Sequence, residues 1–117
     1  MKFMTLVKTT REGAGAPPMA LMQAIGQFGA EAAAAGVLVA KGGLMGKDES
    51  AFIAIRKGKV LITDGPFAES KELVGGYAVY DLPSKAEAME WATRFANLHT
   101  EHWPGWEGDI EVRPMFD

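Results

Sequence analysis

The sequence predicts one α+β domain in which two helices cover one face of an antiparallel sheet. Several short segments alternate in the way typical of strands, and only two segments carry apolar residues at helical spacing. The segments follow the order strand, helix, strand, hairpin, strand, helix, strand. Two helices are too few for a doubly wound sheet, but both can cover one face of an antiparallel one. The length of 117 residues predicts a single domain over residues 1–117.

The first third of the chain predicts a strand followed by a helix. In residues 3–7 both the odd and the even positions carry apolar side chains, so we expect this strand in the centre of the sheet. A helix is predicted to begin at Pro17 or Pro18 and to end at Gly36. Its apolar stripe, with spacings of four and three, consists of Leu21, Ile25, Phe28, Ala32 and Ala35.

The middle of the chain predicts a short strand and a β-hairpin. Residues 37–40 are the short strand, and residues 51–55 and 59–63 are the two arms of the hairpin. The connection is Lys57-Gly58, where glycine supplies the positive φ that a two-residue loop needs. The local cluster of basic residues there is expected to be a solvated hairpin tip.

The last third predicts a strand, a helix and a final strand. Residues 75–82 are the strand, and Ser84 and Glu87 have the spacing of a capping box, so the helix is expected from about residue 85 to about residue 98. Residues 110–115 alternate again, and Pro114 places this strand at an edge of the sheet or at an exit from it.

This order predicts a ferredoxin-like βαββαβ fold with an added hairpin. A sheet covered on one side leaves its other face exposed, and that face is expected to carry apolar residues such as Met4, Leu6, Ile53 and Ile55 or their alternates. An exposed apolar sheet face predicts a partner, most simply a second copy that packs sheet to sheet.

Composition excludes several classes of function. The formal net charge of −3 and the scattered basic residues argue against a nucleic-acid surface. Without any Cys there is no disulfide, no thiolate metal site and no Cys nucleophile. The N-terminus lacks the apolar run of a signal peptide, and no segment approaches the roughly 20 apolar residues of a membrane span. We therefore expect a cytoplasmic protein with no membrane partner.

Asp64 is the candidate catalytic residue. It stands where a strand meets Gly65-Pro66, and an Asp in such a place usually accepts a hydrogen bond from the N–H two residues on, which Pro66 lacks. Its carboxylate is therefore left to cap the N–H of Phe67 or Ala68, to meet a cation or to face a cavity. As a general base it needs a pKa raised by desolvation, which a position beside Phe67 favours. The alternative is a structural turn cap.

Four further residues are candidate ligand contacts: Phe67, Lys71, His102 and Trp103. Lys71 is suited to an anionic group, whereas the neighbouring Glu69 and Glu72 are expected to form surface ion pairs.

The second candidate region follows the predicted second helix. His99 and His102 have a spacing that suits a shared metal if the helix extends that far, but two ligands do not make a site, and capping or surface histidines are the alternative. We therefore assign no metal and no cofactor. Trp103 and Trp106 are expected to form a rigid flap or part of a dimer contact.

Three runs in this order resemble the YCII-related family, in its DGPF-domain branch: residues 64–72, Gly75-Gly76-Tyr77 and Glu111-Val112-Arg113-Pro114. The resemblance implies a ferredoxin-like fold of the dimeric α+β barrel type, with a cleft in each protomer. It also implies an Asp–His pair as the active site of the smaller members. The Asp corresponds to Asp64, while the first helix here contains no His. Some relatives are linked to alternative sigma factors.

Two functions follow from these patterns. The first is a cytoplasmic homodimer that binds a small molecule and uses Asp64 for an acid–base step of the isomerase or lyase type. The second is a non-enzymatic regulatory or protein-interaction module linked to sigma-factor signalling.

Overall fold

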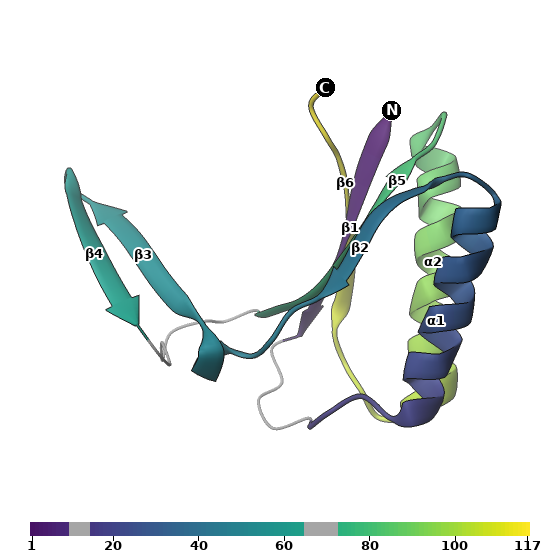
Figure 1. The fold of residues 1–117 in the computed structure, drawn as a ribbon, viewed down its shortest axis with the longest axis horizontal. Coiled ribbons are helices and arrows are strands. Elements are labelled where there is room, and N and C mark those ends of the chain that lie inside the picture. The colour runs from purple at the N-terminus through teal and green to yellow at the C-terminus, as the bar shows by residue number, and fades with distance from the viewer. Residues whose placement is uncertain (10–14, 65–72) are drawn as a thin grey trace.

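The structure, a computed structural model, describes residues 1–9, 15–64 and 73–117, without the side chains of Lys47 and Asp64. Its elements follow the predicted order, with a short 3-10 helix, η1, added before the hairpin (Figure 1). The bounds are β1 Lys2–Thr9, α1 Met19–Ala34, β2 Leu38–Gly43, η1 Lys47–Glu49, β3 Ala51–Arg56, β4 Lys59–Asp64, β5 Leu73–Asp81, α2 Lys85–His102 and β6 Asp109–Pro114.

Four of the strands form one antiparallel sheet in the order β2-β5-β1-β6. Strand β1 pairs with β5 on one side and β6 on the other, which confirms its predicted central place. Within the described strands β6 pairs only with β1, so the strand that ends at Pro114 is an edge strand, as predicted. Both helices cover the same face of this sheet (Figure 1), and the ferredoxin-like α+β fold is confirmed.

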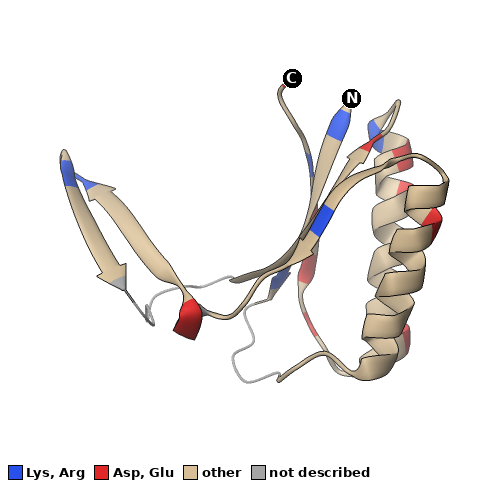
Figure 2. Ribbon diagram, viewed as in Figure 1, with Lys and Arg blue, Asp and Glu red and all other residues tan. Residues whose placement is uncertain are grey.

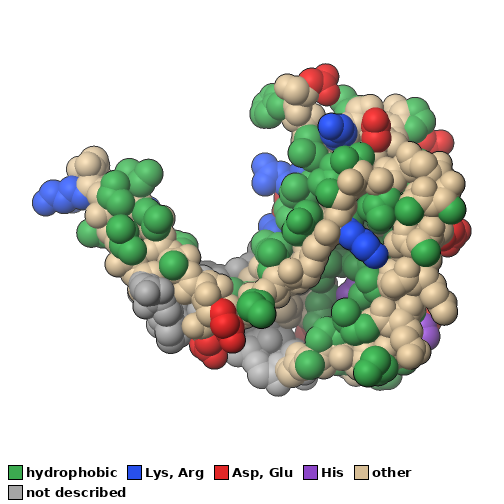
Figure 3. All heavy atoms as spheres, viewed as in Figure 1, with side chains coloured by type: hydrophobic (Ala, Val, Ile, Leu, Met, Phe, Trp, Pro, Cys, Tyr) green, Lys and Arg blue, Asp and Glu red, His purple; other side chains and the backbone are tan. Residues whose placement is uncertain are grey.

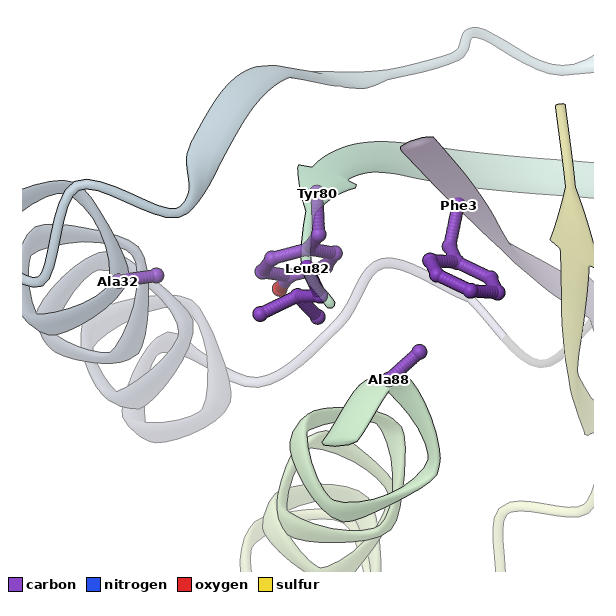
Figure 4. Close-up of a cluster of buried hydrophobic side chains, with 5 residues drawn as sticks. All are labelled: Phe3, Ala32, Tyr80, Leu82 and Ala88. Carbon is purple, nitrogen blue, oxygen red and sulfur yellow. The ribbon is translucent and has the colours of Figure 1, made fainter. Parts of the chain in front are cut away.

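The core lies between the helices and the covered face of the sheet. Phe3 on β1 is 1% exposed because the odd residues of this strand face the helices. Figure 4 shows its ring pointing towards Ala88 of α2, with Tyr80 and Leu82 between it and Ala32 of α1. The members of this cluster are Phe3, Ala32, Tyr80, Leu82 and Ala88.

Residues of the predicted apolar stripe of α1 form much of this core, but the prediction was wrong for one of them. Leu21, Phe28 and Ala32 are buried, but Ala35 is exposed because the helix ends at Ala34 and Ala35 is its C-cap. The stripe therefore stops one turn earlier than its spacing indicated.

Aromatic rings and one arginine join the two helices. Phe28 on α1 meets Trp91 on α2 edge to face, with ring centroids 5.5 Å apart. The guanidinium of Arg94 lies 5.1 Å from the centre of the Phe28 ring and 5.0 Å from that of Trp91, and its Nη2 is 2.5 Å from a carboxylate oxygen of Glu31. These contacts fix the helix pair on the sheet.

Helix α2 begins as predicted and ends later. The side chain of Ser84 accepts a hydrogen bond from the N–H of Glu87, at 3.2 Å. The helix then continues through His102, about one turn beyond its predicted end, because no helix breaker occurs before Pro104. His99 therefore lies within the helix rather than after it. Neither of the described helices is long and apolar enough to cross a membrane.

Strands β3 and β4 form a separate two-stranded sheet, which we call the arm (residues 51–64). Arg56 pairs with Lys59 across a two-residue loop in which Lys57 has φ 53° and Gly58 has φ 76°. These angles are those of a hairpin turn of type I′, which confirms the predicted turn.

The arm stands apart from the four-stranded sheet (Figure 1), and Figure 3 shows an open trough between them. The expectation that Ile53 and Ile55 share one sheet face with Met4 and Leu6 was therefore wrong. Alternation assigns a side chain to a face of its own strand, but it does not say which sheet the strand joins.

Candidate functional site

The predicted catalytic residue lies at the end of the arm. Asp64 is the last residue of β4, and its backbone pairs with that of Ala51. Its side chain lies outside the described part of the structure, and so do the predicted ligand contacts Phe67 and Lys71. The acid–base role of Asp64 remains a prediction.

The other two predicted contacts close the C-terminal end of α2. Nε2 of His102 lies 3.8 Å from a carboxylate oxygen of Glu101. Trp103 is the C-cap, and its N–H donates to the carbonyl of His99 at 2.9 Å. Its ring stacks on Trp106 with centroids 5.8 Å apart. Within residues 1–9, 15–64 and 73–117, no group of three or more His, Asp or Glu side chains is placed to hold a metal ion.

A cleft of about 500 Å³ lies between α2 and β6. One wall is the face of α2 that continues past the core, and the other consists of β6 and the segment that leads into it. Neither His102 nor Trp103 lines it. The lining residues are Met89, Ala92, Thr93, Ala96, His99, Thr100, Trp106, Glu107, Gly108, Asp109, Ile110 and Val112.

His99 is the ionisable ring of this cleft, and it is only 6% exposed. Its Nδ1 lies 3.0 Å from the backbone carbonyl oxygen of Phe95. Because a carbonyl only accepts, Nδ1 carries the proton and donates it to this bond. In the neutral ring, Nε2 then keeps its lone pair, and it has no hydrogen-bond partner among the described residues.

The surroundings of His99 keep this ring neutral. Its centroid lies 5.0 Å from that of Phe95 and 4.8 Å from that of Trp106. Burial lowers the pKa of His99 from its ordinary value, and the bond to the Phe95 carbonyl opposes this shift only in part. Near neutral pH His99 is therefore a hydrogen-bond and proton acceptor.

Sequence reasoning did not place Trp106 and Gly108 in this site. The Trp106 ring lies so close to Gly108 that an added Cβ would run into the ring and into the carbonyl oxygen of Lys8. Only glycine permits this approach. The expectation of a rigid flap or a dimer contact did not use the glycine two residues after Trp106, which was the available signal of close packing against the ring.

The polar groups of the cleft differ in whether they are free to form a hydrogen bond with a ligand. The hydroxyl of Thr93 donates to the carbonyl of Met89 at 2.7 Å, and that of Thr100 donates to the carbonyl of Asn97 at 2.9 Å. Their protons are committed to the helix backbone. The exposed Glu107 and Asp109 make the rim acidic, so acceptors predominate among the polar side chains of the cleft.

Comparison with known proteins shows which family this chain belongs to. The model of the YCII-related domain matches residues 1–105. The chain belongs to the YCII-related family. An uncharacterized protein of Rhizobium meliloti (strain 1021) is 36% identical over 58 residues, which are 50% of this YCII-related chain and 43% of that protein. The matched segment thus spans less than half of this relative, and its printed name gives no activity.

Proposed function

We propose that this YCII-related chain is a cytoplasmic homodimer that binds a small molecule in the cleft between α2 and β6. The observation that supports this most is the buried, neutral His99 on a wall whose two hydroxyl groups already donate to the helix backbone. An acceptor in the lining of a cleft favours a ligand that supplies a donor. With the acidic rim of Glu107 and Asp109, this chemistry favours an apolar molecule that carries an N–H or O–H group and no negative charge.

The test is ligand-observed NMR of the full chain with a library of small aromatic and aliphatic amines and alcohols. Ala96→Leu fills the cleft, and we expect it to abolish the binding seen with the native protein. The matched control is Ala20→Leu on the exposed side of α1, which leaves binding unchanged. Equal binding by both variants would place the ligand elsewhere.

The role of Nε2 is tested by two further variants. His99→Asn keeps a donor near the Phe95 carbonyl but removes the acceptor, whereas His99→Gln places its amide oxygen near the position of Nε2. We expect at least tenfold weaker binding for the Asn variant and smaller loss for the Gln variant. The reverse order contradicts the role assigned to Nε2.

The catalytic part of the proposal remains with Asp64, as the acid–base residue of an isomerase or lyase step. It is supported by the resemblance of the run that begins at Asp64 to the DGPF branch, and by the missing N–H of Pro66. The experiment compares turnover of any ligand found above by the native protein and by Asp64→Asn. Equal turnover by the two proteins contradicts a catalytic role for Asp64. If neither protein turns the ligand over, the chain is a binding protein rather than an enzyme for that ligand.

The homodimer is supported by the apolar face of the four-stranded sheet that the helices leave open. Met4 and Leu6 on β1 pair with Val79 and Tyr77 on β5, so these four side chains lie on one side of the sheet, opposite the side of Phe3. Light scattering at micromolar concentration tests the dimer, and a monomer refutes it.

The second candidate function is a regulatory or protein-interaction module, with the link to sigma-factor signalling that the DGPF resemblance implies. The stacked, half-buried Trp103 and Trp106 favour it, since paired aromatic rings at a surface are common anchors in interfaces. A purified sigma factor from the same cell is the probe. Binding that Trp103→Ala abolishes and Ala96→Leu preserves supports the module over the ligand-binding function.

A further inference from the structure

The cleft between α2 and β6 is long and narrow. Its lining residues on α2 run from Met89 to Thr100 and recur at spacings of three and four, so they form one face of the helix. At the rise of an α-helix these positions cover about 16 Å. Strand β6 returns along α2 in the opposite direction (Figure 1). The start of β6 therefore lies at the end of α2, and the two ends of the cleft are built from different residues.

The end of the cleft near Met89 offers mainly apolar contacts. Val112 on β6 packs against the core cluster that contains Ala88, the residue before Met89. Ala92, one turn further along α2, is also buried, and its small side chain leaves space between the helix and the strand. The hydroxyl of Thr93 in this part donates to the Met89 carbonyl. This end therefore suits a hydrocarbon chain.

The opposite end of the cleft brings two hydrogen-bond acceptors together. One is Nε2 of the neutral His99 ring, and the other is the carboxylate of Glu107. Glu107 follows Trp106, whose ring centroid lies 4.8 Å from that of His99. The hydroxyl of Thr9 on β1 donates to the carbonyl of Glu107 at 3.2 Å, which holds this segment on the domain. The chain thus fixes both acceptors at one end.

Glu107 is better placed for a ligand than the other acid of the rim. Asp109 pairs with Lys8 across the β1–β6 ladder, and the side chains of residues that face each other in a ladder lie on the same side of the sheet. Nζ of Lys8 lies 2.6 Å from a carboxylate oxygen of Glu111. Asp109 therefore shares its side of the sheet with a lysine, and Glu107 is the acid that we assign to the ligand.

This end of the cleft favours positive charge. Figure 2 shows acidic residues on β6 and on the segment before it, and the last turn of α2 adds the negative end of the helix dipole. Among the described residues that line the cleft there is no Lys or Arg. Burial lowers the pKa of His99, so near neutral pH this ring does not repel a cation.

The number of acceptors distinguishes between possible head groups. A hydroxyl group donates one hydrogen bond, a primary ammonium group donates three, and a trimethylammonium group donates none. Only the primary ammonium group combines a positive charge with enough donors for both His99 and Glu107. We propose that the cleft binds a primary amine as its ammonium ion, with the head group on His99 and Glu107 and an unbranched apolar chain that runs along α2 towards Met89. This inference names the ligand class of the small-molecule function proposed above and rests on that function.

The first experiment compares four head groups on one chain. Ligand-observed NMR at neutral pH and low salt measures the binding of octylamine, octan-1-ol, octyltrimethylammonium and octanoate to the native protein. We expect octylamine to bind roughly tenfold more tightly than each of the others, because hydrogen bonds between charged groups are the stronger ones.

The cleft-filling variant Ala96→Leu separates the outcomes of this comparison. We expect it to abolish the binding of octylamine, and octylamine binding that it leaves unchanged lies outside the cleft and overturns the proposal. Equal binding of octylamine and octan-1-ol, both abolished by Ala96→Leu, overturns the amine assignment but leaves the cleft as a ligand site. Binding of none of the four probes overturns the amine assignment, and the proposed function falls with it only if the wider library also fails to bind.

The contact with the carboxylate is tested by Glu107→Gln. This substitution removes the charge and keeps the size of the side chain, so we expect roughly fivefold weaker binding of octylamine and unchanged binding of octan-1-ol. Glu90→Gln is the matched control, because Glu90 is an exposed acid on α2 outside the cleft lining. Equal effects of the two variants on octylamine contradict a contact with Glu107.

The direction of the chain is tested with a short and a long amine. Each further CH₂ group that enters the cleft is expected to raise the affinity about fourfold. Met89→Ala is therefore expected to weaken the binding of decylamine and to leave that of butylamine unchanged, since the short chain does not reach Met89. Met22→Ala on the exposed side of α1 is the control. A Met89→Ala variant that weakens both amines equally, or neither, overturns the placement of the chain along α2.

Discussion

Gly108→Ala tests how the wall of the cleft is built. In the native structure the Trp106 ring lies against the backbone of Gly108, and the Lys8 carbonyl lies on the same side. An alanine Cβ has no room there unless the ring or the strand moves. The backbone of Gly108 does not need a positive φ, so the effect of the substitution is steric rather than conformational.

The size of the effect follows from the atoms involved. One added methyl group in a packed position typically costs about 1–3 kcal/mol. Since part of the obstacle is the backbone oxygen of Lys8, the contact is not relieved by rotating one flexible side chain. For a domain of this size, each kcal/mol lowers Tm by roughly 4 °C.

Urea unfolding followed by circular dichroism measures the loss, and Trp fluorescence reports the displacement of Trp106. The matched control is Gly26→Ala. Gly26 lies inside α1 with open space where its Cβ would be, so alanine there stabilises by about 0.5–1 kcal/mol. Opposite signs for the two substitutions are the expected result, and equal stability of Gly108→Ala and the native protein refutes the packing of Trp106 described above.

A double-mutant cycle identifies the neighbour that resists the methyl group. With Trp106→Leu in place, Gly108→Ala is expected to cost less, because the ring is no longer there to be displaced. The loss of stability that Gly108→Ala still causes in the Trp106→Leu background then comes from the contact with the Lys8 carbonyl and from displacement of the strand. If the two substitutions are simply additive, the ring is not the obstacle.

Three other predictions concern the helices and His99. Ser84→Ala removes the cap of α2 and lowers the free energy of unfolding by about 1 kcal/mol, whereas Ser84→Asp largely retains it in the same urea titration. A cycle of Phe28→Leu and Trp91→Leu gives a coupling energy of about 0.5–1.5 kcal/mol for their edge-to-face contact, and zero coupling contradicts it. The pKa of His99 is lowered by burial, so the unfolded chain binds its proton more readily and stability falls as pH drops below the ordinary pKa of about 6.5. His99→Asn flattens this dependence between pH 7 and 5, and an unchanged slope assigns it to another group.

The sequence was sufficient for the order of elements because the local signals agreed with one another. The two-residue turn at Lys57-Gly58 and the cap at Ser84 depend on nearby residues only, and both were confirmed. The end of α2 was placed too early, since no breaker separates Leu98 from His102 and only Pro104 stops the helix.

The cleft depends on contacts that no local pattern contains. His99 was interpreted as a surface or capping residue, but its burial arises from Trp106, which folds back over it. Trp106 takes this place because Gly108 has no side chain. The spacing of the two histidines suits a metal pair, but within the described residues no group of three or more His, Asp or Glu side chains is placed to hold a metal ion.

Asp64 is both the last residue of β4 and the first residue of the run that resembles the DGPF branch. Asp64→Asn therefore alters the charge at the end of a strand as well as a candidate catalytic group. Turnover lost by a variant that keeps the fold and the oligomeric state of the native protein is evidence for acid–base chemistry. Turnover lost together with the native fold or association assigns Asp64 to structure instead.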